Sequence, residues 1–358
     1  MKSSTGEHYI ALDHLRGLAA FFVVTWHFVH STNGYPVPFE YVPAILPFAL
    51  LDEGHTGVAL FMTLSGYLFA KLLNGKQIVY SAFFWNRALR LLPLLSLVVI
   101  IDAAKKISAG ESVFGYLYWA VRGLLLPALP NGGWSITVEF HFYLLLPLLL
   151  WMLRRSVTWL LVVVLAAICF RIYLYHVQGE VQGLAYWTII GRIDQFVLGM
   201  VAYHLRFRIN CHRWLVLLAL TSFIALYWYF DYQGGFYKNT AYPSPSALWI
   251  VLPALEGLAY ALAIATYDST SFDPGSRASR FLGRIGEYSY SIYLLHFFFV
   301  FAAAKFVHES IMDISNFYLA CCWSLLFFFM MLPLSYLSFR FIEAPFLKLR
   351  RPYVVSRA

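Results

Sequence analysis

Arg16 and His27 lie eleven residues apart in the first long apolar segment of the chain. Eleven helical residues turn through about 1,100° and rise about 16 Å, so both side chains lie on one helix face. A planar guanidinium suits phosphate oxygens, and an imidazole suits general-base catalysis near neutral pH. Acyl-coenzyme A, with phosphates and a reactive group on a long arm, matches this distance. The alternative, favoured when the pair is considered alone, is an orientation-setting arginine and a hydrogen-bonded core histidine.

A carboxylate lies within the apolar and aromatic segment 133–153. Glu139 and Tyr143 are four residues apart and therefore share a helix face. An ionised carboxylate in such a segment needs a partner, and His27 or His141 would serve. A pair of Glu139 with a histidine would orient the imidazole and stabilise its protonated form. Purely structural pairing of Glu139 is the alternative.

Three further places carry ionisable residues in or beside apolar segments. Arg87 and Arg90 lie at the basic cytoplasmic entry to the segment 88–104 and fit orientation charges as well as a second phosphate contact. Arg192 and Asp194 lie in the segment 186–206, where they would line an acceptor cavity or, equally, neutralise each other or their neighbours. His296 lies in the middle of the segment 286–306, where packing is the favoured interpretation.

The composition places these residues in a membrane protein. Hydrophobic residues make up 61% of the 358 residues and charged residues only 12%, against about 25% charged residues in an ordinary soluble domain. Apolar stretches of the roughly 20 residues that cross a bilayer recur from end to end. We therefore predict an all-α polytopic membrane protein whose first helix is retained rather than cleaved as a signal.

About ten transmembrane helices are expected. The predicted spans are 10–30, 54–73, 88–104, 134–153, 157–176, 186–206, 213–231, 247–266, 286–306 and 317–338. An even number of spans places both termini on the same side. The connection 105–133 is expected to be a loop, with an interfacial or re-entrant helix over 114–126 as the alternative.

The basic residues orient this arrangement. With the N-terminus inside, 19 of the 26 Lys and Arg residues fall in cytoplasmic segments and only five in outer loops. This asymmetry predicts that both termini are cytoplasmic. It also explains the net charge of +8 without nucleic acid, which we exclude as a partner. The four cysteines have no metal-binding or disulfide spacing, and no metal site is expected.

Six short motifs follow one another along nearly the whole chain. They are Arg16-x10-His27 within Leu-Asp-x-Leu-Arg-Gly-Leu-Ala, Phe-x-x-Leu-Ser-Gly-Tyr-Leu in the second span, Arg87-x-x-Arg90-Leu-x-Pro93, Trp134-Ser135-x-x-x-Glu139-x-x-x-Tyr143, Gly-x-x-Ser-Tyr-x-Ile-Tyr-Leu-x-His ending at His296, and Arg340-x-x-Glu343-x-Pro345. Together they resemble the acyltransferase 3 family of bacterial transmembrane acyltransferases. Each motif is weak alone, but six in this order are hard to obtain by chance.

The resemblance implies a multi-pass enzyme of the bacterial inner membrane. Such an enzyme moves an acyl group, commonly acetyl, from cytosolic acyl-coenzyme A to a hydroxyl of an extracytoplasmic or lipid-linked glycan. It implies a catalytic role for His27 and Glu139, and contacts with the coenzyme for Arg16, Arg87 and Arg90. The residues expected to bind substrate are Asp13, Trp134, Ser135, Tyr143, Arg192, Asp194 and His296. Residues 1–358 would form a single domain without an appended outer domain, which favours direct transfer to the acceptor.

Two other classes of function stay open at this point. A secondary transporter or exporter of a glycan or small acid would also need many spans and intramembrane charges, but no inverted repeat is visible. A non-catalytic partner in polysaccharide assembly is the third possibility. The expected partners are the lipid bilayer, acyl-coenzyme A, a glycan acceptor and a second copy of the chain. The glycan is not identified, because the aromatic share of 19% fits sugar stacking and interfacial belts equally well.

Overall fold

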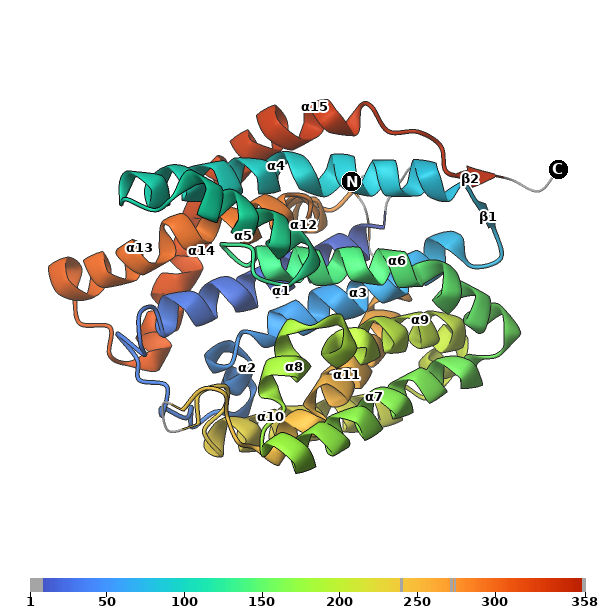
Figure 1. The fold of residues 1–358 in the computed structure, drawn as a ribbon. Helices are drawn as coiled ribbons and strands as arrows, with labels where there is room; N and C mark the ends of the chain where they lie inside the picture. The colour runs from blue at the N-terminus through green and yellow to red at the C-terminus, as the bar shows by residue number, and fades with distance from the viewer. Residues whose placement is uncertain (1–8, 239–240, 271–272, 274, 356–358) are drawn as a thin grey trace.

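The computed structural model describes residues 9–238, 241–270, 273 and 275–355. Apart from one short antiparallel pair, β1 (Gln77–Ile78) and β2 (Val354–Val355), the regular structure in this part of the chain is helical (Figure 1). The expected all-α class is therefore confirmed.

Each predicted span overlaps one of the long helices, but 286–306 is divided among three helical segments and is bent. The long helices are α1 (Ile10–Val29), α3 (Thr56–Leu73), α4 (Tyr80–Ser108), α6 (Gly133–Arg155), α7 (Val157–Gln178), α9 (Ile189–Cys211), α10 (Arg213–Tyr232), α11 (Leu252–Asp268), α12 (Arg277–Leu295) and α14 (Phe317–Ser338). The connection before α6 contains α5 (Val113–Leu125), so the alternative of a short helix there is confirmed and the loop is wrong. Shorter pieces are η1 (Leu46–Phe48), α2 (Ala49–Asp52), α8 (Gln182–Trp187), η2 (Ala247–Ile250), η3 (His296–Phe298), α13 (Val300–Phe306), η4 (Val307–Ile311), η5 (Phe339–Glu343) and α15 (Ala344–Leu347).

Among the described residues, five helical segments are long and apolar enough to cross a membrane, or six if one bent pair counts as a span. The five are Thr56–Leu73, Gly133–Arg155, Val157–Gln178, Arg213–Tyr232 and Phe317–Leu347. The bent pair joins Arg277–Phe298 to Val300–Ile311 at an angle of 59°. The chain is thus a multi-pass membrane protein. Helices α1, α4, α9 and α11 fall outside this set, although each covers a predicted span.

Local sequence explains where several helices begin and end. The Ser156 side chain accepts from the Thr158 amide at the start of α7, and Gly179 ends that helix with a φ of 77°. The Thr188 side chain caps α9 in the same way through the Gly191 amide. Such capping satisfies amide groups that lipid cannot hydrogen-bond.

The centre of the bundle depends on close helix contacts at glycines. Helix α1 packs against α3 and α12, and α3 packs against α9. A Cβ at Gly66 of α3 would lie 1.9 Å from the Phe196 carbonyl oxygen, and one at Gly286 of α12 would lie 1.8 Å from the Asp13 carbonyl oxygen. Small residues allow this approach between membrane helices. The glycines therefore hold α1, which carries Arg16 and His27, in the middle of the fold.

Candidate active site

Two cavities lie along α1. The larger has a volume of about 810 Å³ and is lined by His27, His30 and His55 together with aromatic side chains. The smaller has a volume of about 110 Å³ and is lined by three arginines and Glu139. In the orientation predicted by the basic residues, the larger is the outer cavity and the smaller is the inner cavity. These two names are used below.

The inner cavity brings together residues from five of the six motifs of the sequence. It is lined by Arg16, Arg87, Arg90, Ser135, Glu139 and Tyr143, which were all predicted site residues. His27 and Trp134 line the outer cavity instead. Arg16 is held by an ion pair of 2.8 Å from its Nη1 to Oδ1 of Asp13, one helical turn earlier. Asp13 is therefore the partner of Arg16 and lines neither cavity.

His27 is held at one ring nitrogen. Its Nδ1 lies 2.8 Å from the Val23 carbonyl oxygen and 3.4 Å from Nε2 of His296. A carbonyl only accepts, so Nδ1 of a neutral His27 carries the proton and Nε2 is the basic nitrogen. The ring also packs edge-on or tilted against Trp26 and Phe297, with centroid distances of 4.8 and 4.5 Å.

His296 lies behind His27 rather than in a cavity. It is fully buried at the C-terminal end of α12, and its Nδ1 lies 3.1 Å from the Ile292 carbonyl oxygen. The Nδ1 proton is therefore donated to Ile292, which leaves Nε2 as an acceptor toward Nδ1–H of His27. The favoured packing role of His296 thus includes a specific contact with the candidate base.

Glu139 has partners that sequence analysis did not predict. Its Oε1 accepts hydrogen bonds from Ser65 at 3.2 Å and from Tyr143 at 2.5 Å. The expected pairing with His27 or His141 is not found, because Glu139 lines the inner cavity and His27 the outer cavity. Ser65 belongs to the Phe-x-x-Leu-Ser-Gly-Tyr-Leu motif of the second span, so this motif contributes a contact to the site.

Arg87 and Arg90 approach the inner cavity from α4. The Arg87 guanidinium lies over Phe69 and Phe83, 5.3 and 5.6 Å from the ring centroids. Nη1 of Arg90 lies 3.7 Å from Oε2 of Glu343, which also accepts from Ser291. Both arginines are thus fixed on one side of a cavity that is open to a ligand.

The two cavities meet at Val58 and Tyr293, which line both. The Tyr293 hydroxyl accepts from Ser135 at 2.9 Å and donates to the Gly132 carbonyl oxygen at 3.2 Å. Gly132 has a φ of 75°, and a Cβ there would lie 2.8 Å from the Tyr293 hydroxyl oxygen. Glycine is therefore required at this boundary. The side chain of Tyr293 separates the arginines from the histidines.

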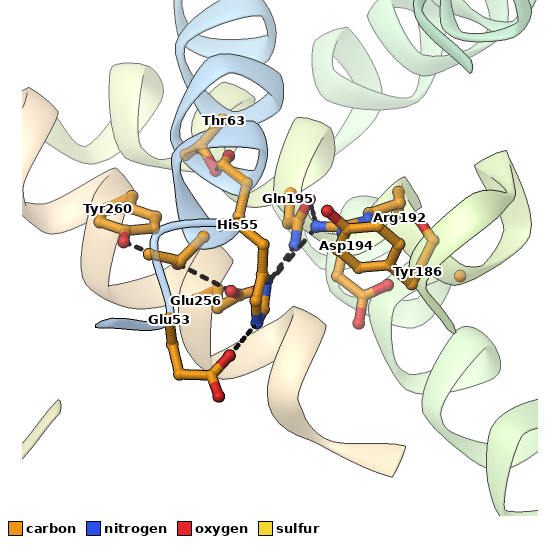
Figure 2. Close-up of polar contacts among 12 residues, drawn as sticks. Glu53, His55, Thr63, Tyr186, Arg192, Asp194, Gln195, Glu256 and Tyr260 are labelled. Carbon is orange, nitrogen blue, oxygen red and sulfur yellow. Dashed lines mark hydrogen bonds and ion pairs between the residues drawn. The ribbon is translucent and has the colours of Figure 1, made fainter. Parts of the chain in front are cut away.

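Arg192 and Asp194 are buried in ion pairs (Figure 2). Arg192 donates from Nε to the Tyr186 carbonyl oxygen at 2.9 Å, and its Nη1 lies 3.7 Å from Oε2 of Glu256. Asp194 accepts two bonds from Arg171, at 3.0 and 2.5 Å. Neither residue lines the inner or the outer cavity. Of the two interpretations of this pair, neutralisation by neighbours is the one that matches the contacts.

Two histidines that line the outer cavity, His30 and His55, form buried histidine–carboxylate pairs that sequence analysis missed. His55 Nε2 lies 2.8 Å from Oε2 of Glu53, and His30 Nε2 lies 3.3 Å from Oδ1 of Asp52 (Figure 2 shows the first pair). The run Asp52-Glu53-Gly54-His55, at the start of the second predicted span, could have indicated these pairs because it places carboxylates next to a histidine. In the described part of the chain, no group of three or more His, Cys, Asp or Glu residues is arranged to hold a metal ion.

The fold and the site define a multi-pass membrane protein with a basic inner cavity that shares two lining residues, Val58 and Tyr293, with an aromatic and histidine-lined outer cavity. The family model described as an acyltransferase domain matches residues 9–340. The chain therefore belongs to the acyltransferase 3 family and is a membrane acyltransferase. Comparisons with curated proteins and with solved structures found no match.

Proposed function

We propose that this protein is an O-acyltransferase that moves an acetyl group from cytosolic acetyl-coenzyme A to a hydroxyl of an extracytoplasmic or lipid-linked glycan. The observation that carries the proposal is the meeting of the two cavities at Val58 and Tyr293. Arginines suited to a donor's phosphates lie on one side of this boundary, and His27 lies on the other. The proposal includes ten spans, cytoplasmic termini, a single domain over 1–358 and a bacterial inner-membrane location.

The donor's phosphates bind at Arg16, Arg87 and Arg90. Guanidinium groups form bidentate hydrogen bonds with phosphate oxygens. The inner cavity is small, with a volume of about 110 Å³, so the nucleotide stays at its cytosolic mouth and the narrow acyl-carrying arm enters. The arm reaches past Tyr293 toward His27, which helical geometry places about 16 Å from Arg16.

His27 acts as the general base in this proposal. Its Nε2 takes the proton of the acceptor hydroxyl while that oxygen attacks the thioester carbonyl. The tetrahedral intermediate then collapses with cleavage of the carbon–sulfur bond, and the proton on Nε2 passes to the leaving thiolate. The products are an ester and free coenzyme A, and His27 returns to its neutral form. His296 accepts from Nδ1–H throughout and stabilises the intermediate imidazolium.

The glycan acceptor binds in the outer cavity. This cavity has a volume of about 810 Å³, and its lining includes Trp26, Trp134, Tyr186 and Trp187. Flat aromatic faces pack against sugar rings while hydroxyl groups bind to polar side chains, as in other pockets that are mostly apolar with a few polar groups. The histidine–carboxylate pairs at His30 and His55 supply such polar groups.

The proposal is tested with purified protein and acetyl-coenzyme A labelled in the acetyl group. We expect saturable donor binding and slow thioester hydrolysis, with hydrolysis lost and binding retained in His27→Ala. The matched control is His212→Gln, an exposed histidine at the end of α9, which should leave both unchanged. Absence of donor binding by the wild-type protein would contradict the proposal and favour a transporter.

A second measurement names the acceptor. Mass spectrometry of surface glycans from cells with and without the gene should show loss of one acetyl modification in its absence. Complementation with wild-type protein should restore it, and complementation with His27→Ala should not. If the glycan lacks a larger acyl group instead of acetyl, the donor is a different acyl-coenzyme A, and the proposed class of reaction stays the same. Unchanged glycans together with intact donor binding would exclude a glycan as the acceptor.

A further inference from the structure

The C-terminal segment that follows α15 is attached to the start of α4. The side chain of Asn86, which is fully buried, donates from Nδ2 to the Arg351 carbonyl oxygen at 2.7 Å. It also accepts at Oδ1 from the Arg351 amide at 2.9 Å. One side chain thus pairs with both backbone groups of one residue, which fixes the position of the chain there.

Further contacts extend this attachment in both directions. The Trp85 indole donates to the Leu349 carbonyl oxygen at 3.3 Å, and the Val79 amide donates to the Tyr353 carbonyl oxygen at 2.9 Å. Tyr353 is 1% exposed and packs edge-on against Phe83. Next to it, β2 pairs with β1 (Figure 1). The backbone on either side of residue 350 is therefore held against α4.

The bonds of Leu349 to Trp85 and of Arg351 to Asn86 place Arg350 against the part of α4 that carries Arg87 and Arg90. These two arginines line the inner cavity and are electrostatic neighbours of Arg350. Glu343 lies 3.7 Å from Arg90. The Nε atoms of Arg87 and Arg350 are buried and have no hydrogen-bond partner in the described residues. Buried polar atoms of this kind indicate a missing ligand or solvent.

The closeness of Arg350 to Arg87 and Arg90 has an energetic cost. Burial, followed by the neighbouring Arg87 and Arg90, lowers the pKa of the Arg350 guanidinium to about 9. A guanidinium nevertheless stays charged at physiological pH. The repulsion is therefore a free-energy cost of the folded protein that a bound polyanion would remove.

We propose that Arg350 binds the phosphates of the coenzyme, so that the C-terminal segment completes a phosphate-binding site begun by Arg87 and Arg90. This inference rests on the proposed function for its donor, but it assigns a new residue and a new segment to the site. The segment also lies beyond residues 9–340, which match the family model. The ligand class is a nucleotide with a diphosphate and a separate phosphate monoester.

The test is calorimetric titration of coenzyme A into the full-length protein in detergent. Arg350→Gln should weaken binding about ten- to hundred-fold, because a hydrogen bond between two charged groups contributes about that factor. The matched control is Arg351→Gln, since the backbone contacts of Arg351 with Asn86 remain and its side chain is exposed. This control should bind like wild type.

Two shorter probes locate the contact. 3′-Dephospho-coenzyme A lacks the monoester, and pantetheine lacks every phosphate. If Arg350→Gln no longer weakens binding when the ligand is 3′-dephospho-coenzyme A, Arg350 contacts the monoester. If it still weakens binding of this ligand, Arg350 contacts the diphosphate. Both results support the proposal. An equal effect of Arg350→Gln on pantetheine would overturn it, because pantetheine offers no phosphate.

Stability separates ligand binding from a structural role. Without ligand, Arg350→Gln should melt at the wild-type temperature or above it, because the repulsion is relieved. Coenzyme A should then raise its melting temperature less than that of the wild-type protein. Lower stability without ligand would assign Arg350 to folding and overturn the proposal. If wild type binds coenzyme A and Arg350→Gln binds equally well, only this inference fails; if wild type does not bind, the proposed function fails.

Discussion

At the scale of single residues, the sequence predicted several residues that line the cavities, but it did not predict their hydrogen-bond partners. Arg16 and Glu139 were predicted from their positions in apolar segments, and both line the inner cavity. The partners of Glu139 and His27 come from helices far away in the chain, namely Ser65 and His296. Periodicity within one helix identifies a shared face, whereas the neighbour of that face depends on tertiary packing.

The first prediction concerns the contact between His296 and His27. Replacing His296 with Leu removes one of the two acceptors at Nδ1 of His27 and leaves the Val23 carbonyl oxygen, so the imidazolium formed during transfer loses a partner. We expect kcat to fall about ten- to hundred-fold, less than the roughly 10²–10⁴-fold contribution of a general base itself, while KM for acetyl-coenzyme A stays unchanged. Steady-state kinetics on the purified protein measures both constants.

His296→Gln is the control for this prediction. The Gln carbonyl oxygen can accept a hydrogen bond where the imidazole nitrogen did, so part of the lost kcat should return. A merely structural role would lower the melting temperature and the amount of active protein, without a separate effect on kcat per active site. Equal kcat in wild type and His296→Leu would contradict the assignment of His296 as a positioning residue.

At the scale of helices, apolar runs in the sequence predicted where the long helices lie but not where a helix is interrupted. The predicted span 286–306 is divided among α12, η3 and α13, with a bend of 59°. The bend follows His296, and the residues on both sides of it are apolar. Hydropathy is therefore continuous through the bend and gives no sign of it. The sequence also does not show which glycines lie at helix contacts, because it does not show which backbone lies opposite each of them.

The second prediction concerns the contact between α1 and α12. Gly286→Ala would place a Cβ 1.8 Å from the Asp13 carbonyl oxygen, so the two helices must separate. We expect a loss of about 1–3 kcal/mol in the free energy of unfolding, the usual cost of overpacking. Donor affinity should fall as well, because Asp13 holds Arg16. Thermal unfolding in detergent and donor titration measure the two effects.

Gly283→Ala, on the same helix, is the matched control. Its Cβ would meet only the side chain of Ile10, at 3.1 and 3.4 Å, and that side chain can shift. Both substitutions add the same gain in helix propensity, about 1 kcal/mol, so the comparison isolates the contact with Asp13. Similar stability and donor affinity in the two variants would show that α1 does not depend on this approach.

At the scale of the whole molecule, the distribution of basic residues links the fold to a direction of transfer. The predicted orientation places 19 of 26 Lys and Arg residues on one side. The inner cavity is lined by Arg16, Arg87 and Arg90, and α4, which carries the last two, begins next to the pair β1 and β2 (Figure 1). Hydropathy therefore predicted where the long helices lie, and the orientation stays a prediction. The cavities themselves arise from packing among many helices and were beyond sequence analysis.

The last prediction is that the donor is used from one side of the membrane only. Coenzyme A is too polar to cross lipid, so inverted vesicles should hydrolyse labelled acetyl-coenzyme A, whereas right-side-out vesicles should not until detergent opens them. Orientation is checked independently with a membrane-impermeant maleimide. Cys211 is exposed at the end of α9, beside Arg208 and Arg213, so it should be labelled from the same side as the donor is used. Labelling of Cys211 and hydrolysis on opposite sides would contradict a donor site at the arginine-lined cavity, because one face carries both the basic residues and the phosphates they bind.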